Sequence, residues 1–183
     1  MTFTITEEEK QILLDTAREA IDAKLMKRKP SYNTPTETLK TVCGAFVTLH
    51  KRGSLRGCIG NIIGTKPLAE TVKEMAISSA FHDPRFPPLS KEEFKDIDIE
   101  ISVLSPLKKI DSIEEIKTGE HGIYIQRGAA SGVLLPQVAT EQGWDRDTFL
   151  THTCYKAGLP ASCWEDPQTE ISIFSAIVFG EHD

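Results

Sequence analysis

A cysteine set between two glycines is the part of this chain best suited to chemistry. The segment is Leu55-Arg-Gly-Cys-Ile-Gly60. Side chains alternate faces in an extended strand, so Arg56 and Cys58 are predicted to lie side by side. A guanidinium beside a thiol favours the thiolate, the nucleophilic form of cysteine. Gly57 and Gly60 leave backbone N–H groups uncovered by side chains, as an anion or oxyanion site requires.

A structural interpretation of the same segment stands beside the functional one. Cys58 is either a nucleophile, redox thiol or thiolate ligand, or a small buried group beside glycines that make a bulge or a tight strand crossing. Arg56 either activates the thiol or forms a salt bridge with a carboxylate such as Glu100. If Cys58 is a catalytic thiol, Arg56 and Cys58 must face the same cleft, toward Glu100 or His82.

A cysteine nucleophile needs a proton acceptor. His82 is the first candidate among the five histidines because it precedes Asp83 in a proline-rich loop, and His121 is the second; we expect His50 to be a surface residue. Glu100 is the carboxylate candidate because it lies on the polar face of an alternating strand. Two further residues are predicted to bind substrate, each with a structural alternative. Arg85 is either an anion contact or holds its own loop through Asp83, and Gln137, at the start of a helix, either binds substrate or caps the helix.

Several common motifs do not fit. Gly57-Cys-Ile-Gly60 matches the G-x-x-G of KH domains, but its flanks resemble strands rather than helices. Gly60-Asn-Ile-Ile-Gly64-Thr-Lys66 lacks the P-loop spacing. The four cysteines (Cys43, Cys58, Cys154, Cys163) form no C-x-x-C pair and no zinc pattern. The sequence therefore predicts no metal site and identifies no cofactor.

Length, composition and net charge limit the classes of protein to which the chain can belong. The chain has 183 residues, 39% of them hydrophobic, which fits one globular domain. A formal net charge of −6 argues against general nucleic-acid binding, which normally needs a basic face. We find no signal peptide and no apolar run long enough to span a bilayer. We therefore expect a cytoplasmic protein with reduced thiols and no membrane association.

Helical and strand patterns are mixed along the chain. Thr6 and Glu9 form a capping box that predicts a helix to about Arg28. Strands are predicted at 42–49 and in the Cys58 segment, paired antiparallel through a turn at Lys51-Arg52-Gly53. Further helices are predicted after Pro67, Pro136 and Asp145, and two short ones are predicted to be capped by Ser90 with Glu93 and by Asp111 with Glu114. Further strands are predicted near 97–103, 122–126, 132–135 and 171–179. This order predicts an α+β fold with antiparallel sheets and flanking helices.

The chain resembles the AMMECR family, whose microbial members are labelled AmmeMemoRadiSam system protein A. The resemblance rests on several motifs in the same order along nearly the whole chain: Leu55-Arg-Gly-Cys-Ile-Gly60, Asp83-Pro-Arg-Phe-Pro-Pro88, Glu100-Ile-Ser-Val-Leu-Ser105, Gly132-Val-Leu-Leu-Pro-Gln-Val138, Trp144, Lys156-Ala-Gly-Leu159 and Trp164.

The resemblance implies a single domain over residues 1–183 with two lobes of unequal size. The larger lobe would be built from both chain ends, the smaller from the middle, with the cysteine motif near the cleft between them. It also implies association with a Memo-like protein and a radical-SAM protein. No established activity comes with it.

Two functions are consistent with these observations. In the first, the protein is an enzyme or enzyme component that uses Cys58 on a small anionic or nucleotide-like substrate. In the second, it is a non-catalytic partner that binds protein or RNA through the cleft and the aromatic and proline-rich loop at 81–89.

Overall fold

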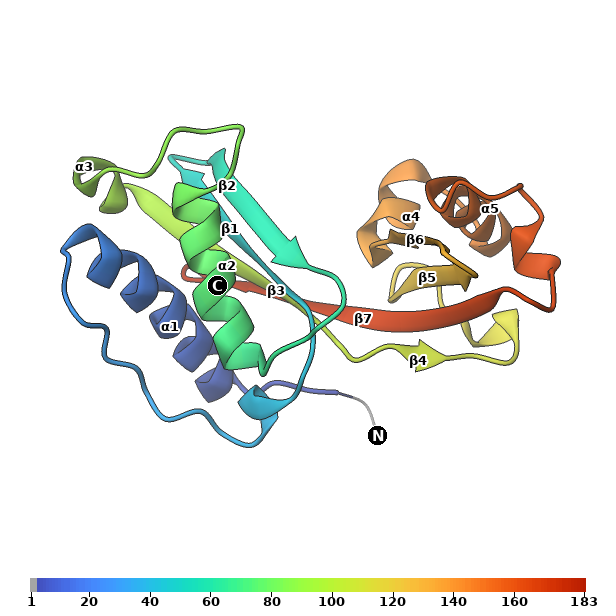
Figure 1. The fold of residues 1–183 in the computed structure, drawn as a ribbon, viewed down its shortest axis with the longest axis horizontal. Helices are drawn as coiled ribbons and strands as arrows, with labels where there is room; N and C mark the ends of the chain where they lie inside the picture. Colours follow the sequence, from blue (N-terminus) through green and yellow to red (C-terminus); the bar gives the residue numbers. More distant parts are fainter. Residues whose placement is uncertain (1–2) are drawn as a thin grey trace. The chain divides into compact units, whose positions relative to one another are not determined.

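The computed structural model describes residues 3–183 and confirms a mixed α+β fold with antiparallel strand pairing (Figure 1). The chain forms two compact units. Unit 1 comprises the residues up to Pro106 together with Ile177–Asp183, and unit 2 comprises Leu107–Ala176. The last strand, β7 (Glu170–Gly180), belongs to unit 2 at its start and to unit 1 at its end.

Unit 1 is a sheet in the order β2-β1-β3-β7 with helices on one face (Figure 1). Its other elements, in chain order, are α1 (Glu7–Leu25), η1 (Thr38–Lys40), β1 (Ala45–Lys51), β2 (Ser54–Asn61), α2 (Leu68–Phe81), α3 (Lys91–Phe94) and β3 (Ile97–Leu104). Alternate residues of β1 and β3 are buried against α1 and α2. The intervening residues therefore lie on the opposite face of the sheet.

The predicted caps of two helices are confirmed. Thr6 and Glu9 form a reciprocal capping box at α1, and Ser90 and Glu93 form another at α3. Helix α1 ends at Leu25, three residues before the predicted end, and Lys27 has a positive φ of 53°. A residue in this left-handed conformation cannot continue the helix.

The β1–β2 hairpin turns through two residues with positive φ, Arg52 at 51° and Gly53 at 83°. Two consecutive residues of this kind form the turn that matches the twist of paired strands. The register then shifts within β2: Leu55 lies opposite His50, but Gly57 lies opposite Leu49. Arg56 is the extra residue of a β-bulge.

Unit 2 has strands in the order β4-β7-β5-β6, with two helices packed on the hairpin. Its elements are β4 (Lys108–Lys109), η2 (Ile113–Glu115), β5 (His121–Arg127), β6 (Ala130–Leu134), α4 (Pro136–Gln142), α5 (Arg146–Lys156) and η3 (Cys163–Glu165). The cap of η2 was predicted one residue too early: Ser112, paired with Glu115, caps it rather than Asp111.

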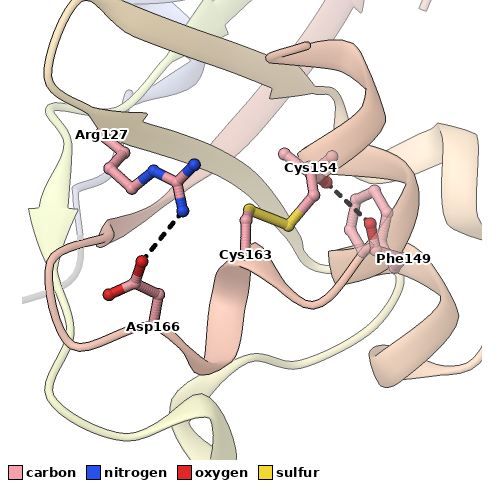
Figure 2. Close-up of a disulfide and its surroundings, with 6 residues drawn as sticks. Arg127, Phe149, Cys154, Cys163 and Asp166 are labelled. Carbon is pink, nitrogen blue, oxygen red and sulfur yellow. Dashed lines mark hydrogen bonds and ion pairs between the residues drawn. A yellow bond between two sulfur atoms is a disulfide. The ribbon is translucent and has the colours of Figure 1, made fainter. Parts of the chain in front are cut away.

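The prediction that all four thiols are reduced is wrong for two of them. Cys154 and Cys163 form a disulfide that joins the end of α5 to η3 (Figure 2). Their separation of nine residues matches neither a C-x-x-C pair nor a zinc-binding pattern. Cys43 is a buried free thiol and Cys58 a partly exposed one. Within residues 3–183, no helix is long and apolar enough to cross a membrane.

Candidate functional site

The bulge at Arg56 decides where the side chains of the cysteine motif lie. Before the bulge Leu55 lies opposite His50, and after it Cys58 lies opposite Thr48. His50 and Thr48 are on the sheet face opposite α1 and α2, since Leu49 between them is buried in the core. Cys58 therefore shares this open face with Leu55, three residues away, instead of with Arg56.

Arg56 lies on the helix side of the sheet, so the prediction that it shares a face with Cys58 is wrong. Its guanidinium donates to both carboxylate oxygens of Glu93 at 3.1 Å and to the Pro87 carbonyl at 2.8 Å. The Arg56 hydrogen bonds lower the pKa of Glu93 from 4.5 to about 2. Lys51, two residues beyond core residue Leu49, reaches the same carboxylate. The partner proposed from the sequence, Glu100, is not the one used.

The Cys58 thiol is hydrogen-bonded to a hydroxyl on the neighbouring strand. The Sγ atom lies 3.1 Å from Thr48 Oγ1, and either atom can donate. Thr48 also lies opposite Glu100 of β3. Cys58, Thr48 and Glu100 thus form one cross-strand row on the open face, and all three are partly exposed. Strands lie about 4.8 Å apart, which puts the thiol and the carboxylate on alternate strands about 10 Å apart at the backbone.

The adjacent row brings a histidine closer to the thiol. His50 is the diagonal neighbour of Cys58 across the β1–β2 pair, because it lies two residues beyond Thr48. Diagonal neighbours are about 7–8 Å apart, within reach of long side chains. His50 lies directly opposite Asp98, whose carboxylate contacts His182 Nε2 at 2.7 Å.

Asp83 and Arg85 hold the backbone of Cys58 at the edge of the sheet. The buried Asp83 carboxylate accepts from the Cys58 N–H at 3.0 Å, and the Arg85 guanidinium donates to the Cys58 carbonyl at 3.3 Å. Arg85 also binds Asp83 through its Nε and Nη2 atoms at 3.0 and 2.8 Å. These bonds from Arg85 hold the pKa of Asp83 well below its usual range. The 83–85 segment thereby satisfies backbone groups that an edge strand leaves open.

The two motif glycines make close packing possible. A Cβ on Gly57 would overlap the Ser79 carbonyl of α2, and a Cβ on Gly60 would overlap the Phe46 ring. The Ser79 hydroxyl accepts from the Ile59 N–H and donates to the Val47 carbonyl, so it joins α2 to both strands. The space beside both glycines is filled by protein atoms, which leaves no open anion cradle there.

The remaining predicted site residues belong to elements other than the three strands of the thiol row. His82 follows the last residue of α2; its N–H donates to the Ser78 carbonyl and its side chain is exposed. Gln137 is exposed in the first turn of α4 in unit 2. His121, the second histidine candidate, starts β5 in unit 2, where its Nδ1 accepts from the Lys117 N–H.

Sequence reasoning missed Thr48 and His50. The hairpin turn at 52–53 alone would set a regular register in which Thr48 pairs with Gly57 and Cys58 pairs with Val47. The bulge moves the pairing by one residue, so Thr48 instead pairs with Cys58. Among residues 3–183, no group of three or more His, Cys, Asp or Glu side chains is placed to hold a metal ion.

The chain is similar to one family of proteins over most of its length. The AMMECR1 family model matches residues 14–179. Protein MK0488 of Methanopyrus kandleri is 46% identical over 193 residues, covering 98% of this chain and 91% of its own. Protein PH0010 of Pyrococcus horikoshii is 42% identical over 194 residues, covering 99% and 94%. A crystal structure of uncharacterized protein PH0010 matches with a TM-score of 0.75 and 40% identity, over 97% of this chain and 93% of that one.

Proposed function

The chain belongs to the AMMECR1 family, and we propose that it is an enzyme or enzyme component that uses the Cys58 thiol as a nucleophile. The observation that carries the proposal is the contact between Cys58 Sγ and Thr48 Oγ1 at 3.1 Å on the face of the sheet opposite the helices. A structural cysteine is normally enclosed among apolar atoms. Cys58 instead is partly exposed and has a hydroxyl partner.

The proposed roles follow from distance along the sheet. Thr48 donates its hydroxyl hydrogen to the thiolate and stabilises it. His50, one strand away on the diagonal, accepts the thiol proton as a general base. Glu100, opposite Thr48, accepts a hydrogen bond from a donor group of the substrate. His82 is the weaker base candidate because it is the C-cap residue of α2 and not a residue of the sheet face that carries Cys58.

The substrate class is a small anionic or nucleotide-like molecule with an electrophilic centre. Support comes from Arg85, whose side chain is 54% exposed although it binds Asp83 and the Cys58 carbonyl. An exposed guanidinium held beside the nucleophile can still bind an anionic group through its free edge. In the covalent step a bond forms between Sγ and the electrophilic atom, the bond to the leaving group breaks, and the leaving group takes the proton from His50.

The test uses p-nitrophenyl acetate as a general acyl donor. Attack by Cys58 transfers the acetyl group to sulfur and releases p-nitrophenolate, so we expect a burst of one equivalent and an acetyl adduct on the peptide containing Cys58. Cys58→Ala should remove the burst. His50→Gln should slow it about 100-fold, the size of a typical general-base contribution, whereas His82→Gln should leave it unchanged. A burst that survives Cys58→Ala, or equal rates in the two histidine variants, contradicts the proposal.

A second function, binding of a protein or RNA partner such as the Memo-like and radical-SAM proteins, has one supporting observation. The 84–88 segment is exposed at Pro84, Arg85, Pro87 and Pro88, but it is anchored through the Phe86 ring, whose centroid is 5.7 Å from the guanidinium of Arg56 and 5.5 Å from that of Arg85. A rigid exposed segment binds with little loss of entropy. Co-purification of a defined partner with wild-type protein but not with Arg85→Ala, while the acyl burst is absent, favours this function.

A further inference from the structure

Phe46 of β1 lies on the same open sheet face as the thiol row. The residues on either side of it are buried in the core of unit 1, so its ring points away from α1 and α2. In the β1–β2 pair Phe46 lies opposite Gly60. Thr48, the next residue of β1 on this face, lies opposite Cys58. Phe46 is therefore a diagonal neighbour of Cys58, at a distance of about 7–8 Å.

The Phe46 ring covers Gly60, and part of it remains open. A Cβ on Gly60 would lie 2.4 and 2.5 Å from two carbons of that ring. In unit 2 the ring of Phe174 covers Gly122 in the same way, but Phe174 is only 2% exposed, as expected of a ring that serves packing alone. Phe46 is partly exposed although β1 has a strand on each side, so its exposed area belongs mainly to the ring.

Within residues 3–183, Phe46 belongs to neither hydrophobic core and is not among the side chains packed against them. It is paired there with no cation and no second ring, whereas the rings of Phe81 and Phe94 each lie beside a lysine or an arginine. A ring in this situation can accept a planar partner by offset stacking, with ring centres about 4.5–7 Å apart.

Two polar side chains of β3 lie beside the ring. Ser102 is directly opposite Phe46, and Glu100 is its diagonal neighbour, two residues away on the same face. Both are partly exposed, and in the described part of the chain neither side chain has a hydrogen bond or an ion pair. A carboxylate only accepts hydrogen bonds, so the complementary group on a ligand is an N–H or O–H donor.

We propose that Phe46 stacks on a planar aromatic or heteroaromatic ring of the substrate, while Glu100 accepts a hydrogen bond from an N–H group of that ring or of its substituent. The inference rests on the proposed function, because it places the substrate ring beside the thiol that attacks the substrate. A six-membered ring with an amino or amide substituent spans the diagonal from Phe46 to Glu100. Phe46 thereby selects planar substrates, and Cys58 reacts with an electrophilic centre next to the stacked ring.

The experiment measures the binding of benzamide to the wild-type protein through NMR signals of ¹³C-labelled phenylalanine rings. Benzamide has a planar ring and an N–H donor but does not react with thiols, so its binding is independent of the reactivity of Cys58. The chain has eight phenylalanines, and Phe46→Leu identifies the signal of Phe46. We expect a saturable shift of that signal.

Two matched ligands separate stacking from hydrogen bonding. Cyclohexanecarboxamide has the same amide on a non-planar ring, and acetophenone has the planar ring without an N–H donor. Each should bind about threefold or more weakly than benzamide, as expected for loss of one stacking contact or one hydrogen bond.

Phe46→Leu keeps an apolar side chain over Gly60 but removes the planar face. It should raise the dissociation constant of benzamide about threefold or more, measured from the amide signals of β1 and β2. Phe94→Leu is the control, because it makes the same change in α3, where the ring lies beside Arg18. It should leave the affinity unchanged. The remaining amide signals show whether each variant is folded; if Phe46→Leu is not, the three ligands in the wild-type protein decide.

Absence of a saturable shift of Phe46 with benzamide overturns the inference. Equal binding of either matched ligand, or an equal loss of affinity in Phe94→Leu, also overturns it. The acyl burst tests the proposed function separately. Benzamide binding at Phe46 without a burst supports the ring site and contradicts the thiol chemistry, whereas a burst without benzamide binding supports the thiol chemistry and contradicts the ring site.

Discussion

Gly57 of β2 packs directly against the backbone of α2. A side chain there would overlap the backbone of Ser79, whose hydroxyl joins Ile59 of β2 to Val47 of β1. The position of Cys58 in its row depends on this packing, because the next residue along the strand carries the thiol. Gly57 is therefore needed for packing, and it directly precedes Cys58, for which we propose a chemical role.

Gly57→Ala should lower the free energy of unfolding by about 1–3 kcal/mol, the usual cost of forcing extra volume into a packed site. Urea denaturation measures it. Gly180→Ala is the matched control: a Cβ there would first meet the Ile99 carbonyl at 3.5 Å, which is ordinary contact. Its effect should stay within about 0.5 kcal/mol. Equal effects of the two substitutions contradict the packing role of Gly57.

The two free thiols should react differently. Burial raises the pKa of Cys43 to about 11, so almost none of it is thiolate at pH 8 in the folded protein. Iodoacetamide at pH 8 should therefore modify Cys58 and leave Cys43 unmodified until the chain is unfolded in urea. Peptide mass spectrometry before and after unfolding distinguishes the sites. Early modification of Cys43 contradicts its buried placement.

At the scale of elements, the segment between α2 and β3 is held by charged side chains. Arg56 and Lys51 from the β1–β2 hairpin share Glu93, the capping residue of α3, while Asp83 and Arg85 bind the edge of β2. The carboxylate of Glu93 thus links a helix cap to a β-bulge. This explains why Arg56 sits at the bulge: the extra residue turns its side chain toward α3.

Glu93 should make stability depend on acid pH. Its pKa falls from 4.5 to about 2 on folding, so its contribution is complete above pH 4.5 and is lost as the pH falls toward 2. Allowing for solvent screening, the contribution is on the order of 1–2 kcal/mol. Glu93→Gln should be less stable than wild type at pH 7, and the difference should shrink by pH 3. Exposed Glu92→Gln, the control, should show no such trend in urea denaturation.

The disulfide stabilises the second unit. Cys154 and Cys163 are nine residues apart, and a loop of that length is restricted by about 2–3 kcal/mol in the unfolded chain. Replacing both with alanine should lower the stability of unit 2 by that amount, followed through the fluorescence of Trp144 and Trp164. Reduction of the wild-type protein should have the same effect. No change in either experiment contradicts a stabilising disulfide.

At the scale of the whole molecule, strand β7 contributes residues to the hydrophobic cores of both units. Ile171 and Ile173 at the start of β7 belong to the core of unit 2, whereas Phe179 near its end belongs to the core of unit 1. Glu181, just after β7, accepts from Arg18 of α1 and from the Ile99 N–H of β3. The end of the chain is therefore part of the packing of unit 1.

Phe179→Ala should destabilise unit 1 by about 3–5 kcal/mol, as expected for a large cavity in a core. Hydrogen exchange in peptides from α1 and β3 measures this locally. Val178→Ala, which removes an exposed side chain from the neighbouring position, should leave exchange unchanged. Unaltered protection of α1 in Phe179→Ala contradicts the placement of Phe179 in this core.

Local patterns predicted the elements well because their causes are local. The Thr6 and Ser90 capping boxes, the alternation of isoleucines in β3 and the turn at Arg52-Gly53 each depend on a few neighbouring residues. The site depends on the bulge at Arg56, where α2 and α3 pack against β2. Nothing in the spacing of residues 54–62 indicates an extra residue, so the predicted faces of Leu55 and Arg56 were exchanged. The disulfide was missed because its spacing matches no motif.

The reaction of Cys58 with iodoacetamide tests the central claim most directly. In the folded protein at pH 7.5, we expect Cys58 to react at least as fast as the same cysteine in the urea-unfolded chain, because in the proposed mechanism Thr48 Oγ1, 3.1 Å from Sγ, donates to the thiolate. Thr48→Val should slow the reaction about 3- to 10-fold, which corresponds to the net contribution of about 0.5–1.5 kcal/mol from an ordinary hydrogen bond. If folding protects Cys58 from the reagent, or if Thr48→Val leaves its rate unchanged, Cys58 is a structural residue and the proposed thiol chemistry is wrong.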